Sequence, residues 1–330
     1  MKMRQKNTLK NSVYLSKNKY EIPEFNNYEN KIIERNKKIH AKSLDLFSIK
    51  NIFKNINDDK LKERFFETIR QEESFEIGSS SLRRYIISLF NNFFKIKDQK
   101  SPDNIEKYLK LIPYKKGEFS GRTILILISG YLSSESKHSN DWKKLIEEYQ
   151  KKFKDPIIYF FNWPSSKFNL KKILTHRQDF KNARERAKFC GRLLAHMIIC
   201  NEIFNGNKVN LIGFSLGNHV IKHCIKEIEK FKKLDIINNI VFLAGATEIK
   251  QKSNWEKRLS SVKGVIINCY SEEDIALKYC KNITKKETIG SKKLTINGAN
   301  IKNYQISCWH LSYRLNLDLL GNMFLDDLKE

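Results

Sequence analysis

Residues 209–217 read Val-Asn-Leu-Ile-Gly-Phe-Ser-Leu-Gly, and Asn-His-Val-Ile follows directly at residues 218–221. The apolar start predicts a buried strand, and the apolar spacing that follows predicts a helix. The pentapeptide between them fits the G-x-S-x-G turn, which holds a serine hydroxyl above the end of a strand. Gly213 and Gly217 supply the small residues needed where the strand and helix backbones approach closely. A match to this short motif can also arise by chance. The motif therefore supports a nucleophile only if the flanking strand and helix and the other catalytic residues are also found. Ser215 is the candidate nucleophile.

From Arg122 onward, short apolar runs alternate with amphipathic stretches, which is typical of a parallel sheet covered by helices. The expected strands are Thr123–Ser129, Pro156–Phe161, Val209–Gly213, Ile240–Ala244, Val265–Cys269 and Tyr304–Ser307. The expected helices are Trp142–Phe153, Arg184–Ile203, His219–Phe231 and Asn254–Val262. We therefore predict an α/β fold of the α/β-hydrolase type, with a mostly parallel sheet of about six strands and helices on both faces.

The chain divides into three expected regions. Residues 1–40 are polar and basic with little apolar periodicity, which indicates an extended or disordered tail. Residues 41–118 predict a helical N-terminal region with Phe-rich faces, whose last short helix runs through Leu109 and Ile112. Residues 119–330 form the expected hydrolase domain, with the boundary in the polar stretch 115–121.

The chain is strongly basic, with 62 Lys and Arg against 37 Asp and Glu and a formal net charge of +25. The first 120 residues carry +10 and the remaining 210 carry +15, so the excess is spread along the chain. Such a surface favours anionic partners such as membrane headgroups, nucleic acid or acidic proteins. The alternative is that the basic residues only form a solvated lysine-rich surface without a specific partner. No specific nucleic-acid motif is present.

The six cysteines show no C-x-x-C pair, and most lie in apolar runs, which is typical of a reducing compartment. No stretch reaches the roughly 18 apolar residues of a membrane span, and no secretory signal is visible. We therefore expect a cytoplasmic protein. Residues 1–20 carry six Lys and Arg and no acidic residue, which keeps mitochondrial targeting as the alternative.

Two further residues complete a candidate catalytic triad. In α/β-hydrolases the nucleophile, the acid and the histidine follow one another along the chain. Asp274 comes shortly after a late expected strand, and His310 is the one histidine beyond the helix that follows Ser215. His310 would act as general base and Asp274 would orient its imidazole. The rival acids are Glu248, Glu272 and Glu273.

The oxyanion of such a site needs two backbone N–H donors. Leu216 follows the nucleophile, and the second donor is expected in the loop after the first expected strand, where we name Tyr131, with Leu132 as the alternative. His219 and His223 lie four residues apart, a spacing that fits a metal, but no third ligand is apparent. We expect no metal and no organic cofactor.

The same segments resemble one family. Similar motifs occur in the same order in the transmembrane and coiled-coil domain-containing protein four family: Gly213–Gly217, Leu243-Ala244-Gly245-Ala246, Asn268–Ser271 through Asp274, and His310-Leu311-Ser312-Tyr313, together with Ile128–Leu132 and Phe161-Asn162-Trp163. The resemblance covers about residues 115–320. It implies an α/β-hydrolase domain in which Ser215, Asp274 and His310 match the presumed triad of suspected lipases or esterases. The membrane-spanning segments usual upstream in the family are not visible in this sequence.

Two functions of different classes follow. The first is a serine esterase or lipase that acts on a lipid or other acyl ester through an acyl-Ser215 intermediate. The alternative is a non-catalytic hydrolase fold that uses its basic surface and N-terminal tail as a structural subunit of a large assembly. The stretch Lys167–Arg192 combines basic and apolar residues, which fits either a docking surface for anionic membranes or an ordinary helix with a solvated basic face.

Overall fold

The computed structural model describes most of the chain from residue 109 onward. The described residues are 109–114, 123–131, 138–153, 156–165, 176–200, 204, 207–232, 234–248, 258–259 and 262–328. The expected tail 1–40, most of the expected helical region 41–118 and most of the expected helix Asn254–Val262 lie outside the described residues.

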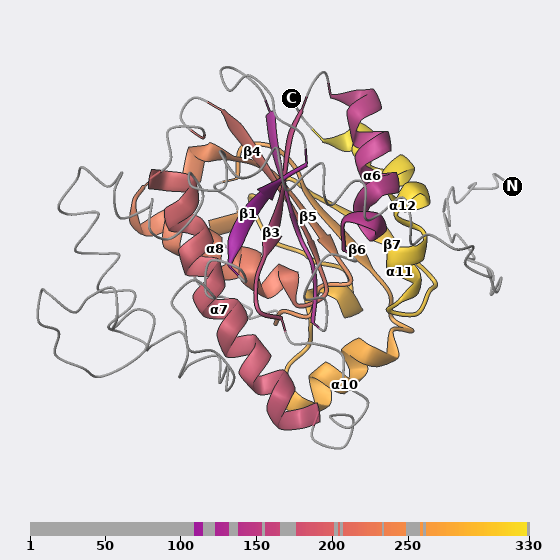
Figure 1. The fold of residues 1–330 in the computed structure, drawn as a ribbon. Coiled ribbons are helices and arrows are strands. Elements are labelled where there is room, and N and C mark those ends of the chain that lie inside the picture. The colour runs from indigo at the N-terminus through magenta and orange to yellow at the C-terminus, as the bar shows by residue number, and fades with distance from the viewer. Residues whose placement is uncertain are drawn as a thin grey trace, which may run out of the picture.

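Seven strands form one sheet in the order β1-β3-β2-β4-β5-β6-β7 (Figure 1). They are β1 Lys110–Pro113, β2 Thr123–Ile128, β3 Ile157–Asn162, β4 Lys208–Phe214, β5 Ile237–Leu243, β6 Ile266–Tyr270 and β7 Ile301–Gln305. All neighbouring pairs are parallel except the pair of β1 with β3. The predicted α/β-hydrolase-type fold is confirmed. Each of the six predicted strands has its counterpart within a few residues.

The first strand corrects the sequence analysis. The short helix expected through Leu109 and Ile112 is wrong, because Lys110–Pro113 is a strand that pairs with β3 and sets Leu111 opposite Phe161. Leu109 and Leu111 are both buried, so the segment has the period of a strand. Pro113 ends this edge strand, where a missing N–H is tolerated. The sheet therefore begins before residue 119.

Helices cover both faces of the sheet (Figure 1). The helices are α6 His138–Lys152, α7 His176–Cys200, α8 Gly217–Lys230, α10 Ile275–Thr284, α11 Ser312–Leu315 and α12 Leu317–Phe324, with short 3-10 helices at Leu234–Ile236, Ile289–Ser291 and Leu325–Asp327. The helices α7 and α8 pack together on one side, and α6 packs with α11 and α12 on the other. Within the described residues, no helix is long and apolar enough to cross a membrane.

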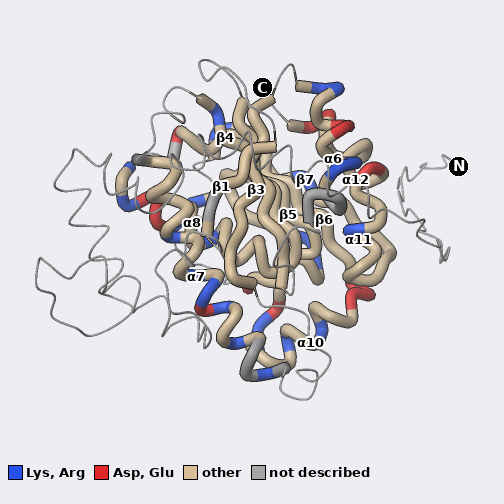
Figure 2. Tube along the Cα trace, viewed as in Figure 1, with Lys and Arg blue, Asp and Glu red and all other residues tan. Residues whose placement is uncertain are grey.

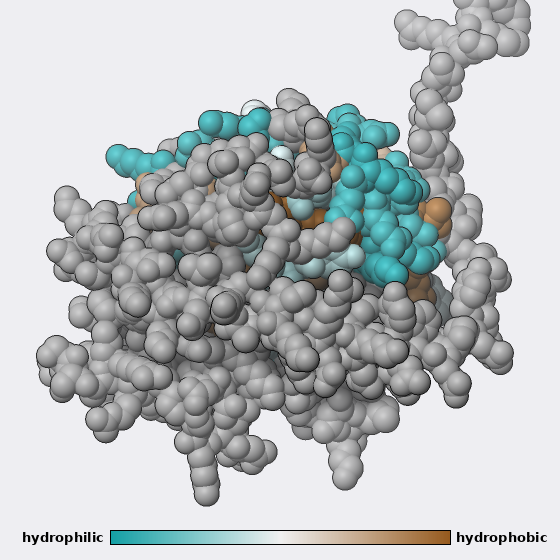
Figure 3. All heavy atoms as spheres, turned by 45° about the horizontal axis from the view of Figure 1, so that its top comes forward, coloured by the Kyte–Doolittle hydropathy of each residue, from teal (hydrophilic) through white to brown (hydrophobic). Residues whose placement is uncertain are grey.

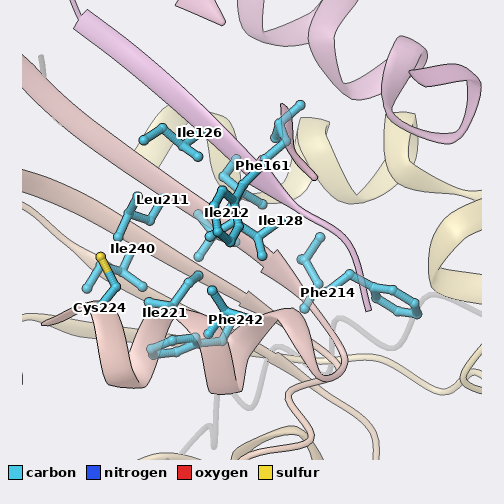
Figure 4. Packing of buried hydrophobic residues seen from close by; sticks show 14 of the residues in the cluster. Ile126, Ile128, Phe161, Leu211, Ile212, Phe214, Ile221, Cys224, Ile240 and Phe242 are labelled. Carbon is cyan, nitrogen blue, oxygen red and sulfur yellow. The ribbon is translucent and has the colours of Figure 1, made fainter. Parts of the chain in front are cut away.

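The central strands carry the core (Figure 4). Leu211 and Ile212 are adjacent in β4 and both are fully buried. Since neighbouring side chains of a strand point to opposite faces, the sheet is covered on both sides, which explains its continuous apolar runs. On the α8 side, Ile221 and Cys224 pack into the same cluster. Five cysteines are free and buried: Cys190, Cys224, Cys269, Cys280 and Cys308.

Charged residues are distributed over the helices. Figure 2 shows Lys and Arg on α6, α7, α8 and α10. The face at the top of Figure 1, turned forward in Figure 3, is mainly hydrophilic where it is described. The basic excess is therefore not gathered on one element of the described part.

A series of buried hydrogen bonds is centred on Asn210, the one polar residue inside the apolar run of β4. Its Nδ2 donates to the Tyr149 hydroxyl of α6 at 2.7 Å. Its Oδ1 accepts from the Asn239 backbone N–H at 3.1 Å and from Asn239 Nδ2 at 2.9 Å. Asn239 Oδ1 in turn accepts from the Val265 N–H at 2.9 Å. These bonds connect α6 with β4, β5 and the start of β6.

Replacing Asn210 by Ala should lower the free energy of unfolding by about 3 kcal/mol, because buried groups of Tyr149 and Asn239 lose their partner. Urea denaturation measures the change. Asn282→Ala, on the exposed face of α10, is the control and should change stability by less than about 0.5 kcal/mol. An Asn210 variant as stable as this control would contradict the structural role of the chain of hydrogen bonds.

Candidate active site

The turn after β4 holds Ser215 in a strained backbone conformation. Its φ is 52°, in the left-handed region that a residue with a Cβ rarely adopts. Two hydrogen bonds hold this conformation: the Ser215 N–H donates to Leu243 O at 2.9 Å, and Ser215 O accepts from the Ala246 N–H at 2.9 Å. The turn is therefore held by the end of β5, and the helix α8 begins two residues later at Gly217.

The two elbow glycines stand where backbones approach closely. A Cβ on Gly217 would lie 2.3 Å from Ile128 O, so α8 can begin against the end of β2 only without a side chain there. A Cβ on Gly213 would lie 2.5 Å from Asn218 Oδ1. Gly217 matches the predicted reason for glycine at the motif, the close approach of two backbones. At Gly213 the two nearest contacts are with side-chain atoms, and the Asn218 backbone N follows at 3.1 Å.

His310 joins the serine to an acid. Its Nε2 lies 2.8 Å from Ser215 Oγ, and its Nδ1 lies 2.7 Å from Asp274 Oδ2. Since a carboxylate only accepts hydrogen bonds, Nδ1–H donates to Asp274 and Nε2 accepts from the serine hydroxyl. His310 thus lies between Ser215 and Asp274, although 95 residues separate it from Ser215. The catalytic roles of the three residues stay predictions.

Asp274 is held at the start of a helix that the sequence analysis did not predict. It is the N-cap of α10, and its Oδ1 accepts from the Leu277 N–H at 3.0 Å. One carboxylate oxygen thus faces His310 while the other caps the helix. The residue is buried, and the N-terminal end of α10 favours its negative charge.

Ser271 forms hydrogen bonds that connect the loop carrying Asp274 with the loop carrying His310. Its buried hydroxyl donates to Cys308 O at 2.9 Å and accepts from the Glu273 N–H at 3.3 Å. The Ile306 N–H also donates to Tyr270 O at 2.8 Å. The sequence analysis did not single out Ser271. Its place in the Ser-Glu-Glu-Asp turn before a helix was the available signal.

The ring of Phe214 packs near the imidazole of His310. The rings of Phe214 and His310 lie 5.0 Å apart with an interplanar angle of 34°. The Tyr313 ring also lies near Phe214, with 6.3 Å between the ring centroids. Nothing in the sequence distinguished Phe214, because the motif leaves that position open.

The loop after β2 lies against the nucleophile, as expected for an oxyanion loop. A Cβ on Gly130 would lie 2.7 Å from Ser215 Cβ, so Tyr131 begins directly beside the elbow. Leu216 forms the N-cap of α8, and no hydrogen bond uses its N–H in the described part of the chain. Leu132 lies outside the described residues. The oxyanion roles of Leu216 and Tyr131 stay predictions.

The rival acid Glu248 lies in a separate ion-pair cluster. Arg184 Nη2 pairs with its Oε1, and Lys222 Nζ lies 3.2 Å from its Oε2. Burial alone would raise the pKa of Glu248, but the charges of Arg184 and Lys222 outweigh it and hold the pKa at about 2. Glu272 and Glu273 are exposed. The geometry therefore favours Asp274 over all three rivals.

His219 and His223 belong to the same cluster. Their rings meet edge to face at 4.7 Å, and His219 Nδ1 lies 3.0 Å from Thr247 Oγ1. Burial, with the charges of Arg184 and Lys222, lowers the pKa of His219 well below its ordinary value, so its imidazole is neutral. No group of three or more metal-binding side chains occurs among the described residues.

Glu248→Gln should lower the free energy of unfolding at neutral pH by about 3 kcal/mol, because Arg184 and Lys222 lose their buried partner. The folded pKa of about 2 lies below the ordinary 4.5. The stabilisation is therefore complete above about pH 5 and is lost as the pH falls from 4.5 toward 2. Urea denaturation from neutral pH into this window should show the difference between wild type and variant shrinking.

Glu147→Gln is the matched control, since Glu147 forms an exposed pair with Lys143 on α6. Its effect should stay near zero at every pH. If the difference in unfolding free energy between wild type and Glu248→Gln stayed constant as the pH falls, Glu248 would not be an ion-paired carboxylate in the folded state.

Three relatives share part of this chain. An uncharacterized membrane protein of Schizosaccharomyces pombe is 35% identical over 146 residues, which cover 43% of this chain and 18% of that protein. The probable lipase MIL1 of Saccharomyces cerevisiae is 28% identical over 173 residues, 50% of this chain and 15% of MIL1. The transmembrane and coiled-coil domain-containing protein STS1 of Oryza sativa subsp. japonica is 25% identical over 166 residues, 48% of this chain and 24% of STS1. The matched segments span at most about a quarter of these relatives.

Solved hydrolase structures show a distant likeness. A dienelactone hydrolase-like phosphotriesterase from metagenomic libraries matches with a TM-score of 0.42 and 10% identity, covering 68% of this chain and 95% of that chain. The lipase BlEst2 of Bacillus licheniformis matches with a TM-score of 0.40 and 13% identity, covering 66% and 96%. The fold assignment rests on the strand order and the elbow rather than on these scores.

A family model described as "Protein of unknown function (DUF726)" matches residues 152–323. This segment contains the elbow, Asp274 and His310, the same motifs that carry the resemblance found in the sequence. The family resemblance is thus confirmed, and because the match spans just over half of the chain, the protein belongs to the DUF726 family.

Proposed function

We propose that this protein is a serine hydrolase that cleaves a carboxylic ester of a lipid or another acyl compound. The observation that carries the proposal is the contact of His310 with both Ser215 Oγ and the Asp274 carboxylate, at 2.8 and 2.7 Å. A serine activated by a base, which is in turn oriented by a third group, is the arrangement that nucleophilic acyl transfer requires.

The proposed reaction has two halves. Ser215 Oγ attacks the ester carbonyl carbon while His310 Nε2 takes the hydroxyl proton, and Asp274 stabilises the charged imidazole. The N–H groups of Leu216 and Tyr131 would bind the oxyanion. When the intermediate collapses, the bond to the alcohol breaks and His310 returns the proton to the leaving oxygen. A water molecule, deprotonated by His310, then attacks the acyl-serine carbonyl carbon. The bond from the acyl group to Ser215 Oγ breaks, His310 returns the proton to Oγ, and the acid leaves.

Two further observations favour an acyl substrate. The rings of Tyr131 and Phe180 meet edge to face at 5.7 Å, and Tyr131 directly follows the glycine that lies against Ser215. Phe180 is buried and Tyr131 is partly exposed, so the pair offers one aromatic ring near the elbow that would suit the apolar part of an ester. The name of MIL1, a probable lipase, agrees with this substrate class.

A fluorophosphonate probe should label the wild-type chain at Ser215, because it reacts with serines activated by a neighbouring base. Ser215→Ala should abolish the label, and His310→Gln should slow labelling by orders of magnitude. Mass spectrometry of the labelled peptide locates the adduct. A folded wild-type chain that takes no label would favour the alternative, a non-catalytic hydrolase fold that serves as a structural subunit.

Asp274→Asn should reduce turnover of a soluble short-chain ester by about 10⁴-fold, because the imidazole loses its carboxylate partner. The melting temperature should stay nearly unchanged, since an Asn side chain can still accept the Leu277 N–H at the N-cap of α10. Glu248→Gln, assayed where it is folded, should keep most of the turnover. The opposite ranking of the two variants would assign the acid to Glu248.

A further inference from the structure

Large apolar side chains are exposed around the candidate triad. Those exposed in the described part of the chain are Leu315 (73%), Leu311 (66%), Ile275 (64%), Trp309 (59%), Tyr279 (47%) and Leu319 (45%). All six lie in α10 or between residues 309 and 319. We call Ile275, Tyr279, Trp309, Leu311 and Leu315 the apolar rim.

The hydrogen bond between His310 and Asp274 connects the two chain segments that carry the apolar rim. Trp309 and Leu311 flank His310, and Ile275 follows Asp274. His310 and Asp274 are in hydrogen-bond contact, so the chain segments on either side of that bond meet at the surface. In Figure 1, α10 lies at the bottom of the molecule and α11 lies above it on the right-hand side. The apolar rim therefore borders the histidine that contacts Ser215.

Basic side chains accompany this surface. The segment 275–286 contains four lysines and no acidic residue, and Figure 2 shows basic residues on α10. These lysines are exposed: Lys278, Lys281, Lys285 and Lys286. Lys281 pairs with Glu287, and the exposed Glu272 and Glu273 lie just before the helix. With Asp274 included, residues 272–287 hold four acidic residues and four lysines. The acidic residues lie at the two ends of this segment, so α10 and the two residues after it present only lysines as charged side chains, in a chain with a net charge of +25.

We propose that the apolar rim is a docking surface for a lipid bilayer with anionic headgroups. Trp and Tyr prefer the interface between headgroups and acyl chains, and leucine side chains insert below it. Lysines at the edge remain at the headgroups, where they attract anionic lipid. Docking through this surface would bring the bilayer to the side of the molecule where His310 meets Ser215. This binding does not depend on ester cleavage.

The position differs from the docking surface expected from the sequence. That expectation placed it on Lys167–Arg192, but Phe180 and Phe189 of α7 are buried in the core, as are Arg186 and Arg192. The described part of that stretch has its larger apolar residues turned inward, and residues 166–175 lie outside the description. The apolar contact comes instead from α10 and the residues around His310.

Flotation with vesicles tests the proposal. Wild-type protein and Ser215→Ala should both float with vesicles of phosphatidylcholine and phosphatidylserine, and the bound fraction should fall as salt rises. The double variant Leu311→Ser, Leu315→Ser should weaken vesicle binding at least tenfold, because it removes two inserted side chains. Both side chains are largely exposed, so the variant should keep its melting temperature. The double variant Lys143→Ser, Glu147→Ser removes an exposed pair on α6 without a net charge change and should bind like wild type.

A second measurement reports on Trp309 directly. Brominated lipids should quench tryptophan fluorescence of the wild type, and most of this quenching should disappear in Trp309→Phe, since Trp142 and Trp163 are buried. Trp255→Phe is the control for the fourth tryptophan and should keep the quenching. Equal flotation of the leucine variant and the wild type would overturn the proposal. So would equal binding to purely zwitterionic vesicles, or self-association through the apolar rim without vesicle binding. Loss of binding in Ser215→Ala would mean capture by the active site instead of docking. The flotation result is independent of whether the chain hydrolyses esters.

Discussion

The left-handed backbone at Ser215 is the constraint on which the candidate site depends. A residue with a Cβ in this region costs about 1–3 kcal/mol, which a short turn cannot offset alone. The cost is offset by the sheet, because Leu243 O and the Ala246 N–H at the end of β5 hold Ser215 on both sides of its Cα. The packing of β4 against β5 thereby fixes the direction of one hydroxyl group.

The other two members of the site depend on the strands farther along the sheet. β6 and β7 are neighbours, so the loops that follow them emerge side by side, and Ser271 joins them through Cys308 O. The N-terminus of α10 holds one oxygen of Asp274, and the Phe214 ring lies against His310. These contacts orient the histidine in the structure without a ligand. In the proposed hydrolysis, this orientation would lower the entropy lost on the way to a transition state.

Much of this arrangement could be predicted from local patterns. The apolar runs before Ser215 and Asp274 mark buried parallel strands, and the order serine, acid, histidine restricts the choice of partners. Local patterns failed where pairing decides the structure. Leu109 and Leu111 alternate like a strand, but a four-residue segment has too few residues to tell a strand from a helix until β3 pairs with it. The sequence also left Glu248 as a rival acid, because charge alone does not show which basic groups surround it.

The sequence by itself determined the elbow, since glycine spacing, turn chemistry and the switch from strand to helix are all encoded within about a dozen neighbouring residues. It also determined the parallel α/β class, because strands buried on both faces need continuous apolar runs. Only the tertiary structure decided which carboxylate meets His310 and which apolar residues stay at the surface. Those outcomes depend on segments brought together by the sheet order, in which Ser215 and His310 meet across 95 residues of chain. Contacts of that range leave no periodic pattern in the sequence, because each side chain is placed by its neighbours in space and not by its neighbours along the chain.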